Sequence, residues 1–93
     1  MGRARKRYVD VLMRLTDEGS FDPVAVMWPD GRAFRISKAT ERGSFGPSFR
    51  GVSTARYGVR IGERKTSLYL ESREGDRALG LPPVLRWWVE TFC

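Results

Sequence analysis

Two residue types that carry much of protein chemistry are scarce in this sequence. Its 93 residues include no histidine, and the single cysteine is Cys93. Histidine is the commonest general base, the usual zinc ligand and a member of the ordinary catalytic triad, so these uses are excluded. One cysteine can form neither a disulfide within the chain nor a cysteine metal cluster, which fits a reducing compartment. We therefore expect no metal and no other cofactor.

Long apolar runs are also absent. The longest, residues 24 to 28, is far shorter than the ~20 residues that a membrane-spanning helix needs. Arg3, Arg5, Lys6 and Arg7 are similar to the basic start of a signal peptide, but charged residues interrupt the stretch that follows them. We expect a cytoplasmic protein without a membrane segment.

Motifs of the common enzyme classes are missing as well. The sequence contains no dinucleotide-binding fingerprint, phosphate-binding loop, nucleophile elbow or EF-hand loop. The carboxylates best suited to acid-base chemistry are Asp17, Glu18, Asp22 and Asp30, and they lie in turn-like sequence. Carboxylates in turns normally bond the backbone or water. We expect a protein that is not an enzyme.

The chain is long enough for one domain with one core. It is 41% hydrophobic and has three Trp, three Tyr and five Phe. Its net charge is +6, but four of the positive charges lie in residues 3 to 7, and the remainder is only mildly basic. We expect residues 1–7 to form a flexible basic arm and residues 8–93 to form a single small β-barrel domain.

The first half of the domain shows the period-two alternation that is typical of strands. The alternation covers residues 8 to 16, 24 to 28 and 32 to 38. For the first of these segments, a helix with a poorer apolar stripe is the alternative. Phe34 and Ile36 share one face of the third segment, and Trp28 is expected in the core. Between the second and third segments, Pro29-Asp30-Gly31 predicts a tight hairpin turn.

The clearest hairpin lies in the second half of the chain. Residues 52 to 61 and 64 to 71 both alternate, and the Gly-Glu pair between them fits a two-residue turn with glycine first. The two strands agree in phase, so apolar residues of both share the inner face. The same register places Arg60 opposite Lys65 on the outer face.

Residues 40 to 51 hold three glycines, one proline and two serines, which predicts a loop. Its Phe45 and Phe49 either cap the open end of the core, which we favour, or are exposed to a partner. Trp87 and Trp88 are adjacent, so both cannot point inward from one strand. An exposed Trp87 would anchor a partner protein together with the two phenylalanines, and packing beneath residues 72 to 83 is the alternative.

The last quarter of the chain is less regular. Residues 72 to 83 predict an excursion from the sheet, with Leu79 and Leu81 tucked against the body of the domain. Residues 84 to 92 fit either a helix that begins near Pro83 or a closing strand rich in aromatic and β-branched residues. Sequence pattern alone does not decide between the two.

Basic side chains are concentrated on the expected outer face. Besides Arg60 and Lys65, the hairpin register places Arg56 opposite Tyr69, and Arg35 lies on a neighbouring strand. Like charges directly opposite each other destabilise a sheet by roughly a few tenths of a kcal/mol, so this arrangement favours a surface that binds a polyanion. The alternatives are a solvated face with Arg56 stacked on Tyr69 and an arginine content set by codon usage. Together with the arm, this face predicts weak, salt-sensitive binding of DNA or RNA by Arg35, Arg56, Arg60, Lys65, Tyr69, Arg3, Arg5, Lys6 and Arg7.

A longer pattern adds a resemblance. In the first half of the chain it comprises Val9, Val11, Arg14, Gly19, Pro23, Trp28, Asp30, Gly31, Arg32 and Ile36. In the second half, residues 57 to 71 read YGVRIGERKTSLYLE and residues 88 to 90 read WVE. This pattern resembles a family of small uncharacterised bacterial β-domain proteins that are often encoded beside Y-family translesion DNA polymerases. The sequence departs from the family in its basic arm, its glycine-rich loop and residues 72 to 83.

The resemblance implies a small barrel, favours a strand over residues 86 to 92 and points to a link with DNA repair. It carries no catalytic residue. We expect an all-β, five- or six-stranded, partly open antiparallel barrel of SH3-like type; the alternatives are an OB-like barrel and a β-sheet with one C-terminal helix. The expected function is an accessory nucleic-acid-binding module linked to DNA repair. The alternative is a protein-protein interaction module that uses Trp87, Phe45 and Phe49.

Overall fold

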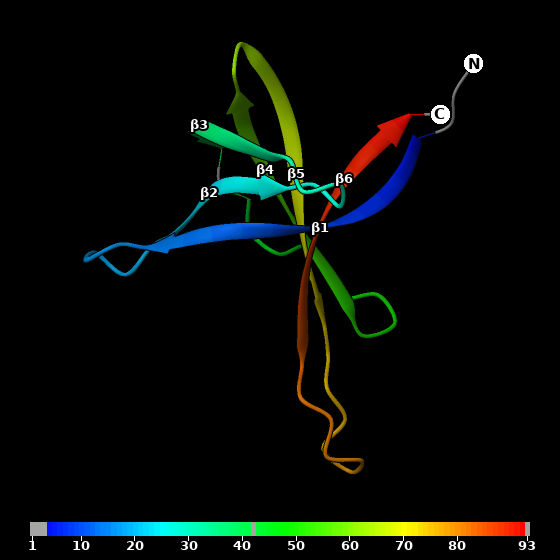
Figure 1. Ribbon diagram of the computed structural model, residues 1–93. Helices are drawn as coiled ribbons and strands as arrows, with labels where there is room; N and C mark the ends of the chain where they lie inside the picture. The colour runs from blue at the N-terminus through cyan, green and yellow to red at the C-terminus, as the bar shows by residue number, and fades with distance from the viewer. Residues whose placement is uncertain (1–3, 42, 93) are drawn as a thin grey trace.

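The computed structural model of the chain describes residues 4 to 41 and 43 to 92. Each strand pairs antiparallel with the next, and the last pairs with the first, which closes the sheet into a barrel (Figure 1). The predicted all-β antiparallel barrel is confirmed, but the expected partial opening is wrong because the sheet is closed. No helix that could span a membrane occurs among the described residues. The strands are β1 (Ala4–Leu15), β2 (Phe21–Met27), β3 (Ala33–Glu41), β4 (Val52–Ile61), β5 (Arg64–Arg73) and β6 (Val84–Phe92).

The tail of the chain is a strand, so the alternative with a C-terminal helix is wrong. β6 pairs with β5 on one edge and with β1 on the other. Only an extended backbone can satisfy a neighbouring strand on each side at once. Alternation along β6 turns Trp87 toward the core, against which it packs, and leaves Trp88 on the outer face.

The pairing of β1 with β6 also corrects the expected arm. Residues 4 to 9 of β1 lie opposite residues 92 to 87 of β6. Residues 4 to 7 are therefore part of the barrel rather than a flexible basic arm, because closure of the sheet needs their main-chain groups. Arg3 lies outside the described residues.

Both predicted tight turns are present. The turn between β2 and β3 is closed by hydrogen bonds from the Trp28 amide to the Arg32 carbonyl oxygen (2.7 Å) and from the Gly31 amide to the Trp28 carbonyl oxygen (2.9 Å). Gly31 has a φ of 94°, which glycine adopts without steric cost. The turn between β4 and β5 has Gly62 at a φ of 62°. The predicted register of this hairpin is confirmed, with Arg60 opposite Lys65.

The core is small and comes from the inner faces of five strands. Its buried members are Val9, Val26, Ile36, Val59 and Leu68, and Leu68 has no exposed surface. Half-buried aromatic residues surround them, including Trp28, as predicted. Because alternate residues point outward, every inward residue leaves a neighbour on the outer face. That outer face carries exposed charged residues, among them Lys38, Arg60 and Lys65.

Long hairpins extend beyond the barrel, and two of them leave it in different directions (Figure 1). One is the outer part of β1 and β2, and the other is the outer part of β5 and β6. At the second hairpin, Leu79 is 71% exposed and Leu81 is also exposed, so the expectation that they tuck against the body is wrong. Phe45 and Phe49 are exposed as well, and Phe49 is 73% exposed. Neither is among the residues that pack against the core, so capping of the core by these two phenylalanines is wrong.

Candidate nucleic-acid interface

Three basic side chains form a row across the outer face of β3, β4 and β5. Lys38 is paired with Arg60, and Arg60 is paired with Lys65. Residues directly opposite each other share a face and have Cβ atoms about 5 Å apart. All three side chains are exposed. We call Lys38, Arg60 and Lys65 the cationic row.

An irregularity in β3 brings Lys38 into this row. Ile36 is paired with Ile61 but Lys38 with Arg60, so Ser37 is an extra residue in β3. The Ser37 hydroxyl donates a hydrogen bond to the Arg60 carbonyl oxygen at 3.1 Å. Without the bulge, strict alternation would turn Lys38 toward the same side as Ile36 and away from Arg60. Lys38 was not among the predicted site residues, since alternation alone gives no sign of a bulge.

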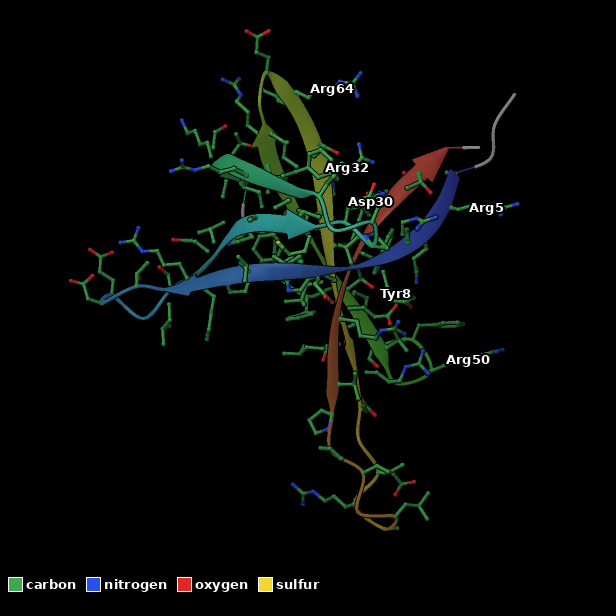
Figure 2. The ribbon with its side chains drawn as sticks, in the orientation of Figure 1. Arg5, Tyr8, Asp30, Arg32, Arg50 and Arg64 are labelled. Atoms are coloured by element: carbon green, nitrogen blue, oxygen red, sulfur yellow. The ribbon has the colours of Figure 1, made fainter. Side chains whose placement is uncertain are left out.

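The charges of the cationic row are not neutralised within the described chain. The ion pairs between described residues are Lys6 with Glu71 and Arg32 with Asp30, and neither includes a member of the row. Arg64 adds a further positive charge at the tip of the β4–β5 hairpin (Figure 2). The positive potential of this end of the sheet is therefore available to a ligand.

A second row crosses the outer face about four residues away, which is roughly 13 Å along the strands. Tyr8, Trp88, Tyr69 and Arg56 lie directly opposite one another on β1, β6, β5 and β4. The Tyr69 ring stacks on Trp88, with centroids 4.0 Å apart and planes 9° from parallel. The predicted pairing of Arg56 with Tyr69 is confirmed, but the ring that stacks on Tyr69 belongs to Trp88. The Nε of Arg56 instead donates a hydrogen bond to the Ser67 hydroxyl at 3.0 Å.

Two cations lie over rings of this aromatic row at the β1–β6 seam. The Lys6 ammonium lies 4.7 Å from the Trp88 ring centroid, and the Arg86 guanidinium carbon lies 3.4 Å from the Tyr8 ring centroid. Cations over ring faces are attracted to the negative π-surface. A nucleic-acid base that stacked on Trp88 or Tyr8 would have to displace these contacts. The row therefore stabilises the barrel seam, where cations lie over the rings of Trp88 and Tyr8.

Glu71 is the buried charge of this region, with 2% of its surface exposed. Its carboxylate accepts hydrogen bonds from the Lys6 ammonium at 3.0 Å and from the Tyr8 hydroxyl at 3.1 Å. Burial of Glu71 acts to raise its pKa. The hydrogen bonds from Lys6 and Tyr8 and the charges of Lys6 and Arg73 outweigh burial, so the pKa lies below the ordinary 4.5.

The remaining predicted nucleic-acid-binding residues are dispersed. Arg35 is exposed on β3. It directly precedes Ile36, which pairs with Ile61 of β4. Arg5 is exposed on β1 and points away from the barrel (Figure 2). Lys6 is bound to Glu71, and the Arg7 guanidinium carbon lies 5.5 Å from the Trp28 ring centroid. Of the predicted set, the structure brings Arg60 and Lys65 together at the cationic row.

The three residues expected to bind a protein partner differ in solvent exposure. Trp87 is half-buried, packs against the core and meets the Tyr57 ring edge-on at a centroid distance of 5.2 Å. Phe45 and Phe49 are exposed in the loop before β4. An exposed anchor at Trp87 is therefore wrong, while the two phenylalanines remain accessible.

A groove lies where β1 and β6 diverge, and no pattern in the sequence predicts it. Its volume is about 810 Å³, and Val9, Leu85 and Trp87 contribute to its lining together with charged Asp10 and Arg86. Such a groove depends on where two distant strands part, which no local pattern encodes. We call it the β1–β6 groove.

No protein-family model, curated protein or solved structure matches this chain. The resemblance to the bacterial β-domain family and the likeness to SH3 barrels therefore stay predictions. Among the described residues, no group of three or more Cys, Asp or Glu side chains is close enough to hold a metal ion. Function has to be inferred from the arrangement of side chains on the barrel.

Proposed function

We propose that this protein is a non-enzymatic nucleic-acid-binding module that holds a phosphate backbone on the outer face of β3, β4 and β5. The observation that carries the proposal is the cationic row. Three directly opposed like charges cost stability, and the described chain offers them no ion-pair partner. A polyanion would supply the missing counter-charge.

The dimensions of the row suit a phosphate backbone. Neighbouring strands lie about 4.8 Å apart, so three residues on adjacent strands span roughly 10 Å. Charges on one strand of a DNA duplex recur about every 3.4 Å along its axis. The cationic row can therefore neutralise on the order of three phosphates.

The aromatic row favours backbone binding over base recognition. A base that stacked on Trp88 or Tyr8 would have to displace Tyr69, Lys6 or Arg86. Stacking on unpaired bases is the usual source of affinity for single strands. We therefore expect little preference for sequence and weak, salt-sensitive binding. DNA is the ligand we favour, since the resemblance to a family encoded beside translesion polymerases links the protein to DNA repair.

A salt titration tests the proposal. Fluorescence anisotropy with labelled duplex and single-stranded oligonucleotides should show binding at low salt, with a slope of log K against log salt of about −3 for duplex DNA. Arg60→Glu should weaken binding and reduce the magnitude of the slope by about one. Arg77→Glu is the matched control, because it makes the same charge change on the exposed β5–β6 hairpin.

Two results would contradict the proposal. The first is no binding of either oligonucleotide at low salt. The second is an equal loss of affinity in Arg60→Glu and Arg77→Glu, which would indicate attraction by net charge rather than binding at the cationic row.

A further inference from the structure

The outer part of β1 has one edge without a neighbouring strand. Residues 10 to 15 pair with β2 on one side. The other edge pairs with β6 only as far as Val9, and beyond that point no described residue pairs with it. β6 turns away there together with β5, so the two hairpins diverge (Figure 1). The open edge presents main-chain donors and acceptors that can pair with another strand.

The side chains along this edge of one copy are complementary to the side chains along the same edge of a second copy. Asp10, Leu12 and Arg14 share one face of β1 by alternation. If a second copy runs antiparallel and is centred on Leu12, the two Leu12 side chains meet and each Asp10 lies opposite Arg14 of the other copy. Leu12 is 55% exposed, and neither Asp10 nor Arg14 forms an ion pair with a described residue. If the two-fold axis moves by one residue in either direction, Asp10 no longer lies opposite Arg14 and the two Leu12 side chains no longer meet.

The same register gives the tip of the β1–β2 hairpin a place to bind. Leu15 and Phe21 are paired on one face of the hairpin, and both are exposed. Centring on Leu12 brings Leu15 just past the end of the open edge of the second copy, where Val9 is already paired with Trp87 and β1 and β6 part. The β1–β6 groove opens there, and its Leu85 is also exposed. Apolar side chains of each copy would thus cover apolar side chains of the other.

We propose that residues 10 to 14 of β1 pair with the same residues of a second copy of this chain and form a two-fold symmetric dimer. A two-fold axis makes every contact occur twice, so two Asp10–Arg14 pairs and two inserted hairpin tips stabilise the assembly. The pairing is β-strand addition, in which main-chain bonds give affinity and side chains fix the register. The proposal does not depend on nucleic-acid binding, because the cationic row lies on other strands.

Sedimentation velocity over a concentration series tests the dimer. The expected species has twice the 10.6 kDa mass of one chain. Leu12→Arg places two like charges at the centre and should leave only monomer. Leu79→Arg is the matched control, since this exposed leucine lies on the other hairpin, and it should not change the mass. Circular dichroism checks that each variant retains its β-structure.

Charge reversal tests the register itself. Asp10→Arg and Arg14→Asp should each weaken the dimer by about tenfold or more, because each puts like charges opposite one another. The double variant with both changes should restore dimerisation to within about threefold of the original. The proposal is overturned by a monomer at every concentration, by a dimer that Leu12→Arg leaves intact, or by a double variant weaker than either single one. If Leu12→Arg loses its β-structure, the charge-reversal series decides alone.

Discussion

Replacing Glu71 with glutamine removes a buried negative charge while keeping the size of the side chain. The carboxylate accepts hydrogen bonds from Lys6 and from Tyr8, and glutamine can accept only part of this pattern. A hydrogen bond to a charged group contributes about 1.5–3 kcal/mol. The Lys6 side chain is 43% exposed, so solvent screens its share to about 0–1 kcal/mol.

We therefore expect Glu71→Gln to lower the free energy of unfolding at pH 7 by about 1–2 kcal/mol. In a domain of this size, 1 kcal/mol corresponds to roughly 4–8 °C in Tm. Urea denaturation followed by circular dichroism measures the change directly. Glu63→Gln is the matched control, because Glu63 is an exposed carboxylate in the β4–β5 turn, and it should change stability by less than about 0.5 kcal/mol.

The effect should depend on pH in a defined direction. The folded protein lowers the pKa of Glu71 below 4.5, so the ionised carboxylate stabilises the fold. This contribution is complete above pH 4.5 and is lost as the pH falls through the folded-state pKa. Glutamine does not titrate, so the stability difference between the two proteins should shrink as the pH is lowered from 4.5 to 3. An equal difference at pH 7 and pH 3, or no difference at pH 7, would refute this reasoning.

Three further predictions concern the core, a turn and the cationic row. Leu68→Ala should lower the free energy of unfolding, measured by urea denaturation, by about 2–5 kcal/mol, because Leu68 is fully buried. Leu79→Ala, at an exposed position, should lower it by less than about 0.5 kcal/mol, and similar losses in the two variants would contradict the assignment of the core. Gly62→Ala should lower the free energy of unfolding by about 1–2 kcal/mol because of the positive φ at Gly62, and Gly62→Asn should lower it by less. The reverse order would contradict the left-handed backbone conformation of the turn. Lys38→Gln should reduce the magnitude of the DNA salt slope by about one and should raise Tm slightly, because it removes the like charge opposite Arg60. Arg5→Gln should leave the slope unchanged, and equal slopes for the two variants would remove Lys38 from the site.

The parts of the fold that could be predicted from sequence are those set by local rules. In the β4–β5 hairpin, a two-residue turn with Gly62 fixes the register, and alternation on both strands agrees with it. The Pro29-Asp30-Gly31 turn specifies the β2–β3 hairpin in the same way. Each of these features depends on residues that are near one another in the chain.

The features that could not be predicted depend on contacts between distant strands. Residues 4 to 7 have the composition of a solvated arm, and only their pairing with β6 makes them part of a strand. Glu71 is buried because Lys6 and Tyr8 reach it from β1 across the seam. Lys38 joins the cationic row through a bulge that shifts one strand against another. The candidate site was thus found in part, through Arg60 and Lys65, and its third member was missed.

Closure of the barrel by β1 and β6 has a consequence for the order of folding. The seam joins Ala4 to Phe92, so its contacts span nearly the whole described chain, and contacts of such separation form slowly because a long loop must close first. During synthesis, β1 to β5 would emerge before β6, and the edges of β1 and β5 would stay unpaired until it followed. The adjacency of the two strands also suits circular permutation: a linker from β6 to β1 and new termini near residues 76 to 81 would keep all six strand pairings. In such a permutant the seam becomes a local hairpin while the β5–β6 pairing becomes the one that spans the chain, so its refolding rate should stay close to that of the original chain.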